Sequence, residues 1–300
     1  MKTGCWFILI FVWLWSDPLW AGTETSADLI EHFSSGQINW TQGLVTAIGE
    51  ISAQEVDGMD MRQKGIDLAF RRAARNAYET LLQLRIDDQQ SGASLFAEDP
   101  YTRSKIMDMA AESKILHMNW SPSGDGTLYV QMSLYGGFSQ FVLPSDIRQV
   151  QPIKPLNGKV HTPDFPDQPS DRHNEIAEPE HYTGLIVDAR GTGAKPSMVP
   201  LLLNENGVEV FGPAYVSREY AVQHGICQYI RITNGSWPSL PRVAPKPLVV
   251  KGLKTDPQGS CRIVISNADA SRLRGSSSHL EFLKQCRVII VLDKFMEALP

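Results

Sequence analysis

The first half of the chain has the hydrophobic pattern of a small mixed α and β unit. Alternating apolar and polar positions over residues 44–52 predict a strand, with Gly49 as a bulge or a point of close approach. A long helix should follow, from a capping pair formed by Asp60 and Gln63 to Leu84. Its apolar positions recur at helical spacing and are rich in alanine, which predicts close packing on a sheet.

Shorter patterns fill the rest of this half. We expect one helical turn around residues 27–33, a helix over 104–113, and strands over 115–120, 127–135 and 138–143. This order is typical of an α+β domain with its helices on one face of an antiparallel sheet.

The second half begins with a buried strand over residues 183–189, which ends at a glycine loop. Two apolar runs, 198–203 and 208–211, flank Asn206-Gly207 and predict a β-hairpin. A short helix over 216–224 and strands over 226–232 and 248–253 should follow, the last pairing with 261–266. The end is interpreted as a βαβ unit, with strand 262–265, helical residues 268–285 and strand 287–292.

These patterns predict an α+β or α/β fold of two modules, one a strand-helix-hairpin domain and the other a mixed sheet with a βαβ end. We expect an N-terminal domain over residues 22–150 and a C-terminal domain over 182–300. Residues 151–181 between them hold six prolines among polar residues, which is the composition of a linker.

Residues 1–21 have the pattern of a secretory signal peptide. Lys2 precedes an apolar run over residues 5–15, and Ala21 supplies a small residue for cleavage. The alternative is a membrane anchor, but this run is shorter than the roughly 20 apolar residues that a spanning helix needs. No other segment is long and apolar enough to span a membrane, so none is expected in the mature chain. We therefore expect an exported protein of the periplasm or the outer-membrane periphery.

Net charge and the lack of known motifs limit which partners and cofactors we expect. The formal net charge is -5 and the acidic residues are dispersed, so nucleic acid is not an expected partner. No motif for a cofactor or a structural metal is present, and we expect neither.

Three cysteines remain after the signal peptide: Cys227, Cys261 and Cys286. If strands 262–265 and 287–292 are parallel neighbours, Cys261 and Cys286 enter the sheet side by side, at a distance that permits a disulfide. Cys227 would then be free. A third strand between them would forbid the bond.

Two groups of residues are candidates for chemistry. Asp188 and Asp293 each follow an apolar strand, and Arg190, Gly191 and Gly193 form a loop after Asp188 that could hold a phosphate or a metal. The alternative is that these carboxylates bind loop amides and only stabilise the fold. His224 and Cys227 are three residues apart, but no third group orients them as a base and a nucleophile.

Several segments together resemble a known family. The signal peptide, the first strand, the alanine-rich residues 68–77 and the strand pair are similar to the N-terminal domain of flagellar assembly protein T and related exported outer-membrane lipoproteins. Residues 182–191, 247–252 and 265–270 also resemble segments that recur in that group. The resemblance implies a structural or assembly role in the cell envelope, with envelope or flagellar proteins as partners and without catalysis.

The rival hypothesis is a periplasmic ligand-binding protein or a metal-dependent hydrolase. Its catalytic or metal-binding groups would be the strand-end carboxylates of Asp188 and Asp293.

Overall fold

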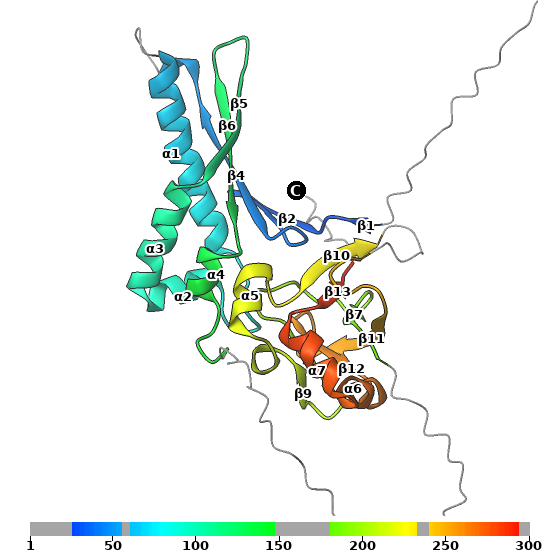
Figure 1. The fold of residues 1–300 in the computed structure, drawn as a ribbon. Helices are drawn as coiled ribbons and strands as arrows, with labels where there is room; N and C mark the ends of the chain where they lie inside the picture. Colours follow the sequence, from blue (N-terminus) through cyan, green and yellow to red (C-terminus); the bar gives the residue numbers. More distant parts are fainter. Residues whose placement is uncertain (1–25, 56–60, 148–180, 233–239, 294–300) are drawn as a thin grey trace, which may run out of the picture.

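The computed structural model describes residues 26–55, 61–147, 181–232 and 240–293 (Figure 1). Within these ranges the chain forms two mixed α and β modules, with seven α-helices, a five-stranded sheet and an eight-stranded sheet. The expected two-module fold class is confirmed. None of the helices in these ranges is long and apolar enough to cross a membrane. The expected signal peptide and most of the proline-rich linker lie outside the described residues.

The five-stranded sheet is antiparallel throughout and belongs to the first module. Its order is β2 (Ile30–Phe33), β3 (Gly36–Asn39), β4 (Leu44–Ile51), β6 (Gly126–Ser133) and β5 (Lys114–Trp120). The strands predicted over 44–52, 115–120 and 127–135 are confirmed. The helical turn expected over 27–33 is wrong, because Trp40 donates its backbone N–H to Leu29 and the segment pairs as a hairpin with β3.

Helix α1 (Met61–Leu82) covers one face of this sheet, and its alanines explain how closely it packs. Ala69, Ala73 and Ala77 are almost completely buried. A Cβ atom added to Gly49 would lie 1.9 Å from the carbonyl oxygen of Ala69, so only glycine fits at this crossing. The predicted close approach is confirmed; Asp60 of the expected capping pair lies outside the described residues.

Three shorter helices complete the first module: α2 (Gly92–Glu98), α3 (Pro100–Ala111) and α4 (Gly137–Val142). Helix α3 corresponds to the helix predicted over 104–113, whereas α2 was not predicted. The strand expected over 138–143 is wrong, because this segment is α4. Phe138 and Val142 are four residues apart and both buried, and a short apolar run does not by itself distinguish a helix from a strand.

The eight-stranded sheet forms the second module. Its order is β1 (Ser26–Ala27), β10 (Gln228–Ile232), β13 (Val288–Val291), β7 (Gly184–Asp188), β11 (Pro247–Thr255), β12 (Arg262–Ile265), β8 (Leu201–Leu203) and β9 (Glu209–Phe211). Helices α5 (Arg218–His224), α6 (Asn267–Arg274) and α7 (Ser277–Lys284) connect these strands. The predicted hairpin of β8 and β9 and the antiparallel pair of β11 and β12 are confirmed.

The expected parallel βαβ neighbours at the end of the chain are wrong. Strands β7 and β11 lie between β13 and β12, and β12 runs antiparallel to β11, which is itself parallel to β7 and β13. With two strands inserted, β12 and β13 are roughly 14 Å apart. Cys261 and Cys286 are therefore not neighbours, and both are free and buried, as is Cys227. The disulfide that strand adjacency would have permitted does not form.

The two modules share one hydrophobic core. Strand β1 leaves the first module and pairs with β10 of the second sheet. The backbone N–H groups of Met198 and Val199 donate to the carbonyl oxygens of Arg85 and Ile86, at 3.0 and 2.8 Å. A continuous cluster of buried side chains runs from the first module into the second.

Candidate functional site

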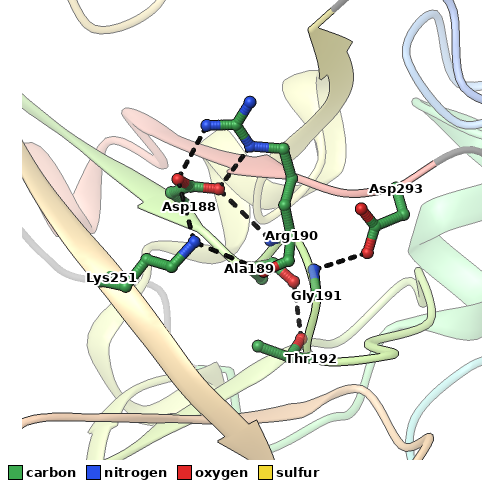
Figure 2. A network of polar contacts seen from close by, with 7 residues as sticks. All are labelled: Asp188, Ala189, Arg190, Gly191, Thr192, Lys251 and Asp293. Atoms are coloured by element: carbon green, nitrogen blue, oxygen red, sulfur yellow. Dashed lines mark hydrogen bonds and ion pairs between the residues drawn. The ribbon is translucent and has the colours of Figure 1, made fainter.

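The expected strand-end residues do come together at one edge of the eight-stranded sheet. Parallel strands β7 and β13 place Val291 beside Asp188, and Asp293 follows two residues later. The glycine loop after Asp188 lies between the two carboxylates (Figure 2).

Asp188 is neutralised by two cations. Arg190 binds both of its carboxylate oxygens, through Nε at 2.8 Å and Nη2 at 2.9 Å, and Lys251 adds a bond from Nζ at 3.2 Å. The hydrogen bonds from Arg190 are the largest cause that lowers the pKa of Asp188 from 3.8 to about 2. The carboxylate is thus ionised at neutral pH, and both of its oxygens already have partners.

Asp293 holds the loop rather than joining Asp188. Its Oδ2 accepts the backbone N–H of Gly191 at 2.7 Å, and the Thr192 hydroxyl donates to the carbonyl oxygen of Ala189 at 2.6 Å. Gly191 and Gly193 have φ angles of 78° and 71°, which non-glycine residues rarely adopt. Asp188, Arg190, Gly191 and Asp293 therefore belong to one network whose bonds stabilise a tight loop, and Gly193 contributes only its backbone conformation. Among the residues described, no three His, Cys, Asp or Glu side chains are grouped so as to hold a metal ion.

His224 and Cys227 do not form a catalytic pair. Cys227 is buried, and burial raises the pKa of its thiol to about 12. His224 ends α5 with its side chain exposed. A thiol that stays protonated is a poor nucleophile.

A pocket at the junction of the modules was not predicted. Its volume is about 710 Å³ and it opens to solvent beside α5. Burial raises the pKa of the Tyr135 hydroxyl on its wall, and the nearby charge of Arg242 opposes that rise. The lining comes from five separate stretches of the chain, so no local spacing could have revealed it. The lining residues are Thr41, Gln42, Tyr135, Tyr220, Gln223, His224, Gln228, Pro241, Arg242, Gln285 and Arg287.

Strand β5 is a second feature with functional potential. It is one of the two edge strands of the five-stranded sheet and, among the described strands, pairs only with β6. Three of its apolar side chains are exposed: Ile115 by 46%, Leu116 by 40% and Trp120 by 38%. In Figure 1 the hairpin of β5 and β6 points away from the second sheet. Apolar side chains on a sheet edge are typical of a surface that pairs with another chain.

One comparison with known proteins bears on the second module. Residues 184–294 match the family model of the second domain of Treponema pallidum Tp0624. The match covers 111 of the chain's 300 residues and begins at the first residue of β7. It includes Asp188, Asp293 and most of the pocket lining, whereas the first module lies outside it. No curated protein matches the chain.

Proposed function

We propose that this chain is an exported bacterial cell-envelope protein with a structural or assembly role, acting through protein-protein contacts. The observation that carries the proposal is the apolar edge strand β5. Exposed apolar side chains on an unpaired sheet edge fit a surface that binds another protein, because that contact would remove them from water.

The signal-like residues 1–21 support export. The resemblance to flagellar assembly protein T supports a partner in the envelope or the flagellar base. The match to a domain of a Treponema pallidum protein supports a bacterial origin. The hydrolase alternative has less support, because Asp188 is bound by Arg190 and Lys251 and Asp293 by a loop amide.

The mode of contact follows from the chemistry of β5. An extended segment of the partner would add a strand to the free edge, and its backbone would satisfy the outward N–H and C=O groups of β5. Lys114 begins β5 and the strand carries no acidic residue, so a partner segment with apolar residues and a carboxylate beside Lys114 fits best.

Site-specific photo-crosslinking in the native bacterium tests the proposal. A crosslinker at Leu116 should give a discrete adduct with an envelope protein. A crosslinker at Met107, which is more exposed than Leu116 but lies on α3, should not. Leu116→Lys should abolish an Ile115 adduct, because a charge on the edge opposes pairing. The proposal fails if Leu116 and Met107 give the same adducts, or if the protein keeps residues 1–21 and stays in the cytoplasm.

A further inference from the structure

The junction pocket contains two arginines without acidic partners. Arg242 and Arg287 make no ion pair with any described residue, and none of the lining residues is Asp or Glu. Their bonds go to backbone carbonyl oxygens instead. Arg242 donates to Cys286, His224 and Gly225 at 2.7, 2.9 and 2.7 Å. Arg287 donates to Arg242 and Ala244.

These bonds fix both guanidinium groups but do not use all their donors. A guanidinium carries five N–H groups. The carbonyl bonds use three on Arg242 and two on Arg287, which leaves two and three donors. Two positioned cations with spare donors favour an anionic group such as a carboxylate, which arginine binds in bidentate geometry.

The glutamines of the pocket supply acceptors. The side-chain N–H groups of Gln42, Gln228 and Gln285 donate to Asp28, to the carbonyl oxygen of Thr41 and to Glu281, at 2.6, 3.2 and 3.1 Å. These bonds hold the three amides in place. Each amide oxygen keeps its lone pairs for a donor from a ligand, and hydroxyl groups are such donors.

Aromatic side chains supply flat apolar surface in the same pocket. Tyr135 and Tyr220 come from different modules, and Tyr220 is exposed. Aromatic rings of this kind pack against apolar faces of a ligand while the polar groups around them bind its edges. A volume of about 710 Å³ is within the range of small-molecule sites, and a module junction is a common position for one.

We propose that this pocket binds an acidic carbohydrate, meaning a sugar that carries a carboxylate. The carboxylate contacts Arg242 and Arg287, the hydroxyl groups donate to the glutamine oxygens, and a sugar face packs on a tyrosine. This binding function goes beyond the protein-contact role of β5 and uses a different surface.

Calorimetric titration of the full chain tests the proposal with three probes: digalacturonate, its neutral counterpart digalactose, and inorganic phosphate. We expect digalacturonate to bind at least about 10-fold more tightly than digalactose, which has no carboxylate for the arginines. It should also bind at least about 10-fold more tightly than phosphate, which has no sugar face for the tyrosines and lacks the hydroxyl groups of a sugar. Its affinity should also fall as salt is raised.

Two variants locate the site. Gln223→Glu places a negative charge in the pocket at an exposed helix position, and should weaken digalacturonate binding about 10-fold. Gln140→Glu makes the same change at an exposed position of α4 outside the pocket lining, and should leave the affinity unchanged. Tyr220→Ala should weaken binding at every salt concentration, because it removes apolar contact. Circular dichroism confirms that each variant is folded.

Four results would overturn the proposal. Equal binding of the neutral disaccharide would remove the role of the arginines. Phosphate binding as tight as digalacturonate binding would leave a simple anion site. Equal affinities for wild type and Gln223→Glu, or no binding of digalacturonate, would remove the pocket as the site.

Discussion

The ring of Tyr135 packs against the backbone of Gly225, although one residue belongs to the first module and the other to the second. A Cβ atom at Gly225 would lie 2.7 Å from Cε1 of Tyr135, and the φ angle of Gly225 is 73°. The contact thus requires glycine both for space and for backbone conformation.

Gly225→Ala is therefore expected to destabilise the whole protein. A positive φ angle and a displaced ring together should reduce the free energy of unfolding by about 1–3 kcal/mol. Chemical denaturation followed by fluorescence measures the change. Gly137→Ala is the control, because its φ angle is not positive and its Cβ would meet only the flexible end of Met109 at 3.2 Å. Equal effects of the two variants would contradict the close packing at Gly225.

Asp188→Asn should lower stability at neutral pH but not in acid. The folded pKa of Asp188 is depressed to about 2, so its charge stabilises the fold above the unfolded pKa near 4 and ceases to do so as pH falls toward 2. At pH 7 the loss should be about 1–2 kcal/mol, and the two proteins should converge between about pH 5 and pH 2.

Thermal unfolding across this pH range checks the prediction. Asp293→Asn is a suitable control, since the amide oxygen of asparagine can still accept the N–H of Gly191. A difference between wild type and Asp188→Asn that stays constant from pH 7 to pH 2 would show that the ion pairs do not cause it.

The three buried cysteines should be unreactive in the folded protein. Burial raises the pKa of Cys227 and of Cys286 to about 12 and also raises that of Cys261. At pH 8, alkylation of each thiol should be about 100-fold slower than in denaturant. Peptide mapping follows each site separately and should find no disulfide-linked peptide. A linked pair of Cys261 and Cys286 would contradict the strand order.

Cleavage between the modules should not separate them. A protease site inserted at residue 165 lies in the proline-rich segment that the sequence predicts to be a linker. After cleavage the fragments should co-elute in gel filtration, because β1 pairs with β10 and one core spans both modules. They should also unfold in one transition. Two separate peaks without denaturant would show that the modules fold independently.

Much of the architecture is contained in local sequence patterns. The apolar spacing of residues 66–84 predicts α1, and the alanines on its buried stripe predict its close packing on the sheet. Asn206-Gly207 predicts the hairpin of β8 and β9, because glycine readily adopts the positive φ angle of a tight turn. In the structure the φ angle of Gly207 is 76°. In each case the residues that decide the structure are close together in the chain.

Local sequence patterns thus predict the two-module fold class, most elements and the residues of the Asp188 loop. Which strands are neighbours depends on contacts between distant segments: β7 and β11 separate β12 from β13, which no local pattern encodes. The bond from Lys251 to Asp188 depends on such contacts as well, because Lys251 lies on another strand. The pocket likewise depends on tertiary structure, because its lining residues are distant in the chain and come together only when both modules bury one shared core.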